Sequence, residues 1–161
     1  MTNLKVEFYL RLILIISLVS IISAYFIEYV LGHQPCNLCL IERIPYGLSI
    51  ILITLNYFFK KNENFIILLL ILTFFFSFAI SVYHLGIEQG LFEESAVCGL
   101  KNTTGIISKE EILKQLQEKS VSCKDVTFRI FGLSLTSINI LLSLILTILL
   151  TKIYISYEKN K

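Results

Sequence analysis

Four long apolar runs, separated by polar segments, dominate the pattern of the chain. They cover residues 12–31, 44–59, 65–83 and 131–150. A helix needs about 20 residues to cross the roughly 30 Å hydrocarbon core of a bilayer, and three runs approach that length. None of the runs alternates apolar and polar residues as transmembrane strands do. The pattern therefore predicts an all-α membrane protein, a bundle of four transmembrane helices.

The second run is the shortest, with 16 residues that no charged residue interrupts. We therefore expect its span to extend back through Glu42 and Arg43, so that it covers 42–59, or to thin the bilayer locally. The first run follows basic residues, as a signal peptide does, but it is long, and bulky residues surround the small ones that a cleavage site would need. We expect it to be an uncleaved helix.

The connecting segments differ in length. We expect one integral membrane domain over 1–161, with a short outer loop at 32–41 and a long outer loop at 84–130, between the third and fourth helices. Ser108 and Glu111 form a capping-box pattern in the long loop. The pattern predicts a short amphipathic helix that lies on the membrane surface or packs on its own domain.

Composition supports a membrane location, and the distribution of charge predicts the orientation of the chain in the membrane. Hydrophobic residues make up 55% of the chain and charged residues 16%, against about 25% charged in typical soluble domains. The net charge of +2, without a basic stripe, argues against a nucleic-acid partner. Seven Lys and Arg residues lie in 1–11, 60–64 and 151–161, and seven lie on the other side over about twice the length. The positive-inside rule then predicts cytoplasmic termini and four outward-facing cysteines.

The sharpest motif is the CxxC of Cys36 and Cys39, within PCNLCLIERIPYG. Such pairs form an easily exchanged disulfide, and a thiol with a lowered pKa makes them reactive. Arg43 follows Cys39 by four residues, which places both on one face of a helix. Pro45 suits the first turn of a helix, so we expect the second span to begin near Arg43 and Cys39 to lie at its positive end.

Other interpretations of these residues are weaker. A zinc site would need a second close pair of ligands, and Cys98 and Cys123 are far apart in sequence, so we expect no metal. A purely structural Cys36–Cys39 bridge would close a trivial loop and stabilise little. Arg43 would be a snorkelling side chain in the blandest interpretation, but charged residues inside a membrane boundary are costly and tend to be functional.

The remaining pair and the remaining polar residues leave alternatives open. Cys98 and Cys123 fit a structural staple of the long loop, or a second redox pair that exchanges with the CxxC. The chain has no Rossmann or flavin fingerprint, so a quinone dissolved in the bilayer fits as the final electron acceptor. His84 fits an interfacial anchor or a hydrogen-bond donor to a quinone oxygen. Glu28, near the outer end of the first run, has no role that the sequence explains.

The order of these features resembles the disulfide bond formation protein B (DsbB) family of bacterial inner-membrane quinone reductases. PCNLCLIER before the second run, YHLGIEQGLFE after the third and C…FGLSL before the fourth carry the resemblance. It implies that Cys98–Cys123 oxidises a periplasmic thioredoxin-like thiol oxidase of the DsbA type. It further implies that Cys36–Cys39 reoxidises that pair and reduces ubiquinone or menaquinone. The residues that the resemblance places at the quinone are Glu42, Arg43 and His84.

Two other classes share part of the pattern. A four-span scaffold of the tetraspanin type also has a short and a long outer loop, but it keeps its cysteines in the large loop with a CCG motif, which is absent here. Vitamin K epoxide reductase performs similar chemistry, but its CxxC follows the loop pair, whereas here it precedes it. A scaffold with structural disulfides is therefore the alternative to an oxidoreductase.

Overall fold

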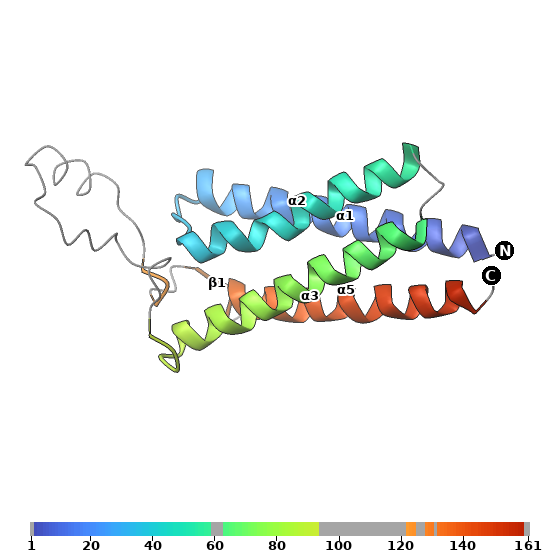
Figure 1. Ribbon diagram of the computed structural model, residues 1–161. Helices are drawn as coiled ribbons and strands as arrows, with labels where there is room; N and C mark the ends of the chain where they lie inside the picture. Colours follow the sequence, from blue (N-terminus) through green and yellow to red (C-terminus); the bar gives the residue numbers. More distant parts are fainter. Residues whose placement is uncertain (1, 59–62, 94–121, 125–127, 131, 160–161) are drawn as a thin grey trace, which may run out of the picture.

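Four long helices and one short hairpin make up the part of the chain that the computed structural model describes, which is all of it except residues 1, 59–62, 94–121, 125–127, 131 and 160–161. The elements, shown in Figure 1, are α1 (Thr2–Tyr29), α2 (Asn37–Phe58), α3 (Glu63–Glu88), β1 (Arg129–Ile130), β2 (Leu133–Ser134) and α5 (Leu135–Glu158).

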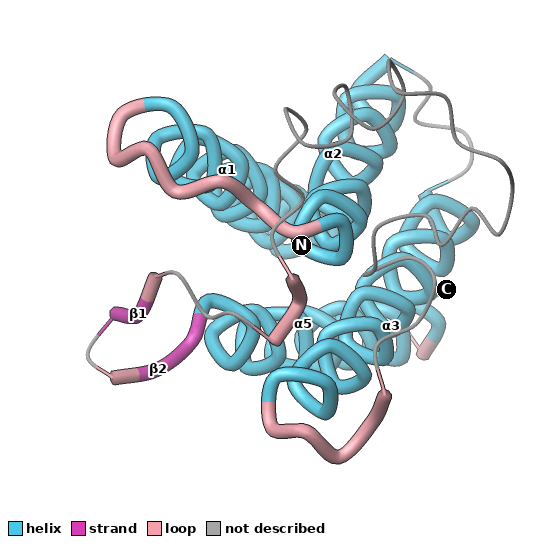
Figure 2. The backbone as a smooth tube through the Cα atoms, turned by 90° about the vertical axis from the view of Figure 1, so that its left-hand side faces the viewer, coloured by secondary structure: helices cyan, strands magenta, loops and turns pink. Residues whose placement is uncertain are grey.

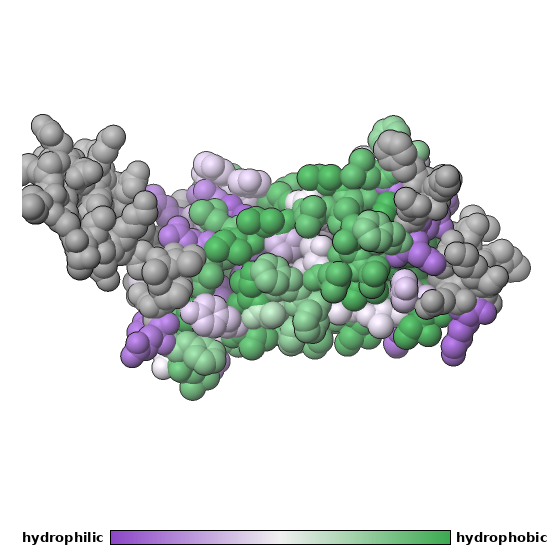
Figure 3. All heavy atoms as spheres, in the orientation of Figure 1, coloured by the Kyte–Doolittle hydropathy of each residue, from purple (hydrophilic) through white to green (hydrophobic). Residues whose placement is uncertain are grey.

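All four helices are long and apolar enough to cross a membrane. The candidate spans have 22 to 26 residues: Val6–Tyr29, Asn37–Phe58, Glu63–Glu88 and Leu135–Ser156. Large apolar side chains point outward along them, and in Figure 3 they form a band between two more hydrophilic ends. In water this surface would be strongly unfavourable, whereas lipid covers it at no cost. The prediction of an all-α membrane protein with four transmembrane helices is confirmed.

The helices pack as two neighbouring pairs. Figure 2, viewed along the bundle, shows α1 beside α2 and α3 beside α5. The most extensive contact joins α3 to α5, α2 packs on both α1 and α3, and α1 touches α5 only weakly. Figure 1 shows the two termini at the same end of the bundle. The cysteines that the structure describes lie at the opposite end.

The start of α2 differs from the prediction. The helix begins at Asn37, well before the expected boundary at 42, because Cys36 caps it. Pro45 lies inside the helix and not in its first turn. A proline removes one backbone donor, but a membrane helix tolerates it where neighbours satisfy the freed carbonyl. At 1.5 Å per residue, α2 is about 33 Å long, enough to cross the bilayer without thinning it.

The facing ends of α3 and α5 also differ from the expected spans. α3 continues beyond 83 to Glu88, so His84 lies in its last turns, and Gly90 (φ +75°) then ends it with a left-handed residue. α5 begins at Leu135 and not at 131, because the residues before it form the antiparallel hairpin of β1 and β2. Gly132 (φ +83°) supplies the positive φ of that turn.

The interior changes character along the bundle. Near the termini it is mostly apolar, with Leu10, Ile53, Leu70 and Leu150 fully buried, although Asn56 is buried there too. Buried ionisable side chains lie at the cysteine end, where Glu42 and His84 are accompanied by Ser81 and Thr136. In a bilayer, such groups are retained only where they satisfy one another. The polar end is therefore where function is to be sought.

Some predictions fall outside the described residues. Cys98, the amphipathic helix expected after Ser108 and most of the turn at 60–64 lie there.

Candidate functional site

Cys36 caps the N-terminus of α2, and this fixes the geometry of the CxxC. Its carbonyl oxygen accepts from the backbone N–H of Leu40 at 3.2 Å. Its sulfur accepts from the backbone N–H of Cys39 at 3.3 Å. The sulfur thus occupies the place of a capping oxygen, where the free N–H groups of the first turn favour negative charge. The sequence suggested Cys39 for this position, but the structure places Cys36 there.

The two sulfurs of the CxxC lie 3.0 Å apart and are hydrogen bonded. The bond can run either way while both thiols are protonated. Once Cys36 is ionised, its sulfur accepts from the Cys39 thiol. That hydrogen bond is the main cause that lowers the pKa of Cys36 to about 4; burial opposes the change, and a bond to His84 adds to it. Cys36 is therefore the thiolate of the reduced pair.

The donor atoms of Cys36, Cys39 and His84 lie within 4.8 Å of one another, which is close enough for a metal ion. The sulfur separation argues against that use. Two thiolates bound at 2.3 Å to a tetrahedral zinc lie about 3.8 Å apart. A disulfide would bring them to about 2.05 Å. At 3.0 Å, the pair fits a hydrogen-bonded dithiol that can close to a disulfide with a small movement.

His84 lies directly behind the CxxC. The residue is 1% exposed. Nε2 is 3.5 Å from the Cys36 sulfur, and Nδ1 is 2.9 Å from Oε1 of Glu42. His84, which lies on α3, thus bridges two groups at the start of α2. One is Cys36, which precedes the helix, and the other is the carboxylate of Glu42, one and a half turns inside it. This cysteine–histidine–carboxylate series is continuous and buried.

A polar network extends from Glu42 into α5. Its Oε2 accepts from Nδ2 of Asn139 at 3.1 Å, and Asn139 also donates to Ser81 at 2.7 Å. Tyr46 donates its hydroxyl to Oδ1 of Asn139. Because Glu42, Tyr46, Ser81 and Asn139 come from three helices, they hold α2, α3 and α5 together at the polar end.

A second branch links His84 to Glu88. The hydroxyl of Thr136 lies 3.3 Å from Nδ1 of His84 and donates to Oε1 of Glu88. Glu88 is one turn beyond His84 on α3, and its Oε1 lies 3.9 Å from Nε2 of that ring. Two carboxylates therefore face one imidazole.

Arg43 points to the other side of α2, toward α1. Its Nη1 donates to Oε2 of Glu28, and its guanidinium carbon lies 5.2 Å from the centre of the Tyr25 ring. Glu28, which the sequence left unexplained, is thus the ion-pair partner of Arg43. The side chains of Arg43 and Glu28 remain 18% and 20% exposed, so the pair is half-buried at the edge of the bundle.

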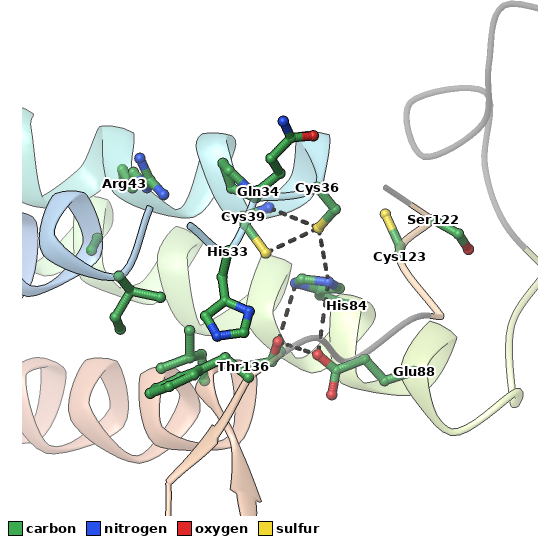
Figure 4. Close-up of a pocket in the computed structure, with 15 residues that line it drawn as sticks. His33, Gln34, Cys36, Cys39, Arg43, His84, Glu88, Ser122, Cys123 and Thr136 are labelled. Carbon is green, nitrogen blue, oxygen red and sulfur yellow. Dashed lines mark hydrogen bonds and ion pairs between the residues drawn. The ribbon is translucent and has the colours of Figure 1, made fainter. Parts of the chain in front are cut away.

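A cavity brings the two sides together. Its lining side chains include Cys36, Cys39, Arg43, His84 and Glu88, most of them labelled in Figure 4. Ala24 and Ile27 of α1 add an apolar wall. Glu42 is not among the lining residues, because its carboxylate turns inward to His84 and Asn139. The cavity holds about 70 Å³.

Cys123, which lies in the segment between α3 and α5, is also at this site. It is 3% exposed and packs in a buried cluster with Cys36, Leu38 and Ile87. Figure 4 shows its side chain on the side of Cys36 that faces away from Arg43. The structure therefore brings three of the four predicted cysteines to one site, while Cys98 lies outside the described residues.

The predicted Arg43 and His84 also lie at this site, but sequence reasoning missed several of their partners. Glu28, Glu88, Thr136 and Asn139 contribute polar groups from three helices. Each is a polar residue within or next to an apolar run, which was the available signal. Their pairing depends on the rotation of one helix against another, which no single run reveals.

Comparison with known proteins gives a consistent result. The family model for the disulfide bond formation protein DsbB matches residues 7–153. The uncharacterized protein RP370 of Rickettsia prowazekii (strain Madrid E) is 33% identical over 156 residues, which cover 94% of this chain and 90% of that protein. No solved structure matches the chain.

Proposed function

The chain belongs to the DsbB family of disulfide bond formation proteins, and from that premise we propose that it is a thiol:quinone oxidoreductase. It takes electrons from a periplasmic thioredoxin-like thiol oxidase of the DsbA type and passes them to ubiquinone or menaquinone. Cys36, Cys39, Cys98 and Cys123 carry the electrons. Arg43 binds the quinone, and the chemistry needs no metal.

The observation that carries the proposal is the position of the CxxC. Cys36 caps, and Cys39 lies in the first turn of, a helix that is long and apolar enough to span a membrane. Both line a cavity to which Ala24 and Ile27 of α1 contribute apolar side chains, so a bilayer-dissolved molecule is a fitting oxidant. A soluble redox partner alone would not need a reactive pair at the start of a membrane-spanning helix. A structural disulfide would not need a thiol whose pKa is about 4.

The residues at the cavity fit a quinone. A quinone supplies an acceptor for two electrons and two protons. Arg43 carries five N–H donors, of which Glu28 takes one, so the guanidinium can also hold a carbonyl oxygen. Cys39 lies one helical turn before Arg43 on the same cavity wall. The volume of about 70 Å³ is below the roughly 300–1,000 Å³ of drug-sized ligand pockets, so only the reacting edge of a ring enters.

The outer cysteines connect the site to the soluble partner. Cys123 packs against Cys36, so the reduced loop pair can pass its electrons to the CxxC by thiol–disulfide exchange over a short distance. We assign Cys98 to the partner side of the relay. This division keeps the partner at the polar outer end and the quinone at the apolar flank.

Orientation and location are part of the proposal. The denser positive charge of the segments at the end with the termini places that end in the cytoplasm, so the cysteines face the periplasm across a bacterial inner membrane. Intact cells that are reduced and then treated with a membrane-impermeant thiol reagent test this. Labelling of Cys98 and Cys123 only after the membrane is broken would reverse the orientation.

Steady-state kinetics test the electron path. Purified chain with a reduced DsbA-type thiol oxidase should reduce a short-chain ubiquinone or menaquinone. Cys98→Ser and Cys123→Ser should abolish partner oxidation but leave Cys36 and Cys39 oxidisable by quinone. If quinone-driven oxidation of the CxxC is lost equally in these variants, the relay is wrong. If wild type reduces no quinone but keeps all its disulfides, the chain is the four-span scaffold.

A further inference from the structure

The contact between Cys36 and His84 is the feature of the site that the electron path leaves unused. The ring is fully buried, lies 3.5 Å from the Cys36 sulfur through Nε2 and meets Glu42 at 2.9 Å through Nδ1. A histidine that served only as an interfacial anchor would keep one face in water. Here both ring nitrogens are directed at protein groups.

The partners of Nδ1 determine which nitrogen carries the proton in the neutral ring. Glu42 offers a carboxylate oxygen, which only accepts, so Nδ1 is the donor. Thr136 gives its own hydroxyl hydrogen to Glu88, so its oxygen also faces Nδ1 as an acceptor. The lone pair of the neutral ring therefore lies on Nε2, which faces the sulfur of Cys36.

We propose that Nε2 of His84 is the proton acceptor for the Cys36 thiol, and that Glu42 is the positioning residue that holds the ring in the required tautomer. The inference rests on the proposed function in one respect: oxidation of the CxxC is the reaction that requires Cys36 to lose its proton.

The step balances without a further reagent. The S–H bond of Cys36 breaks and an N–H bond forms at Nε2, which leaves a thiolate beside an imidazolium. The electron pair of the thiolate then forms the S–S bond with Cys39. A bound quinone would take two electrons and the proton of Cys39 through Cys39, and it would need one more proton. The proton of Cys36 is available for this, because it is held on His84, whose ring lines the cavity and whose Nε2 lies 3.9 Å from the carboxylate of Glu88.

The charges around the ring suit this role. The groups that face His84 are Cys36 from the segment before α2, Glu42 from α2, Glu88 from α3 and Thr136 from α5. Two of the four are carboxylates, so the positive charge that the ring gains is offset on both sides. Asn139 in turn fixes Glu42 by donating to its second oxygen.

The test is the pH dependence of Cys36 alkylation in the full chain, purified in detergent, reduced, depleted of quinone and kept with a chelator. The rate for Cys36 is read from peptide masses with iodoacetamide between pH 3 and 9. In His84→Gln the midpoint of the curve should rise by at least one pH unit, which means a rate at least tenfold lower on the acid limb. Glu42→Gln keeps an acceptor for Nδ1 but removes the charge, so a smaller rise is expected.

The chain offers a matched control, because its only other histidine lines the same cavity. His33 packs on Phe128, with ring centres 5.1 Å apart, and His33→Gln should keep the wild-type midpoint. With two histidines, ¹⁵N spectra of the rings are also assignable. At one pH, the same for both samples, the His84 ring should be protonated in the reduced wild-type chain and neutral in Cys36→Ser.

The outcomes separate the two proposals. If His84→Gln folds and the midpoint of Cys36 alkylation stays at the wild-type pH, the proposal that His84 is the proton acceptor is overturned. The proposal is also overturned if His33→Gln raises that midpoint as much as His84→Gln does. If His84→Gln does not fold, an unchanged midpoint in Glu42→Gln overturns the proposal. Because no quinone is present, a shifted midpoint together with failed quinone reduction in wild type would refute the proposed function and leave the proton acceptor standing.

Discussion

Glu42 and Arg43 are neighbours on α2, yet their side chains enter two different regions of the molecule. Glu42 points between α3 and α5 into a closed network, where its side chain is 10% exposed and His84 only 2%. Arg43 points toward α1, where it and Glu28 are about twice as exposed as Glu42. Successive helical residues differ by about 100° in direction, which is enough to separate them.

The difference between the two regions suggests a division of tasks. In the Glu42 region the buried ring of His84 contacts the side chains of Cys36, Glu42 and Thr136, so this region suits a proton held at a fixed atom. The Arg43 region is half-open beside the apolar wall of α1, so it suits a ligand that enters from the bilayer. The cysteines lie between them, and each region acts on the pair from its own side.

The largest expected effect comes from Arg43. Arg43→Ala should lower kcat/KM for quinone by about 100-fold or more, near 2.7 kcal/mol, because the charge and all its donors are lost. Arg43→Lys should cost about tenfold, since the charge stays but the planar fork is lost. The pH midpoint of Cys36 alkylation should not move in either variant. Quinone reduction at the wild-type rate in Arg43→Ala would show that this arginine only snorkels.

Substitution of Glu28, the ion-pair partner of Arg43, should have a smaller effect on quinone reduction. Glu28→Gln keeps the size but removes the charge that orients Arg43, so KM for quinone should rise about three- to tenfold. A double-mutant cycle with Arg43→Lys measures the coupling between the two side chains. Strictly additive losses would mean that Glu28 does not act through Arg43.

On the other side of α2, the expected effect is on stability. Glu42→Leu leaves Nδ1 of His84 and Nδ2 of Asn139 without their carboxylate. A buried donor that loses its partner costs about 1–3 kcal/mol. We expect the thermal midpoint in detergent to fall, and to fall more than in Glu28→Leu, whose partner is half-exposed. The reverse order would contradict the contrast between a closed and an open region.

A pH dependence is also expected for the stability of the reduced chain. The pKa of Cys36 is about 4 in the folded chain, against an ordinary thiol value of 9.0. The ionised form is thus favoured by folding, and this stabilisation is complete above pH 9 and lost as the pH falls toward 4. The thermal midpoint of the reduced chain, measured relative to the oxidised chain, should decline over that window. A difference that is independent of pH would contradict a Cys36 thiolate.

The two regions also show what a sequence reveals and what it withholds. The four helices followed from their apolar runs, because a bilayer imposes length and composition on each span separately. The CxxC and Arg43 followed from spacing within one helix. The start of α2 could not be predicted from the sequence, because a cysteine that caps a helix with its sulfur resembles a loop residue.

The contacts between helices could not be predicted. Whether Glu42 meets His84 and Asn139, and Arg43 meets Glu28, depends on how α1, α3 and α5 are rotated about their axes. The sequence placed Cys39 at the positive end of the second span, on one helix face with Arg43, which pointed to Cys39 as the thiol with the lowered pKa. The structure favours Cys36, since the thiol and the backbone N–H of Cys39 and the ring of His84 all lie at that sulfur.

A single-turnover experiment tests the central claim most directly. Fully reduced Cys98→Ser chain, depleted of quinone, receives one equivalent of ubiquinone or menaquinone, and the thiols that remain are counted by alkylation and located by peptide mass. The account predicts the loss of two thiols per quinone reduced, at Cys36 and Cys39, with Cys123 still alkylated. Reduction of the quinone with Cys36 and Cys39 both intact, or no reduction at all, would contradict it.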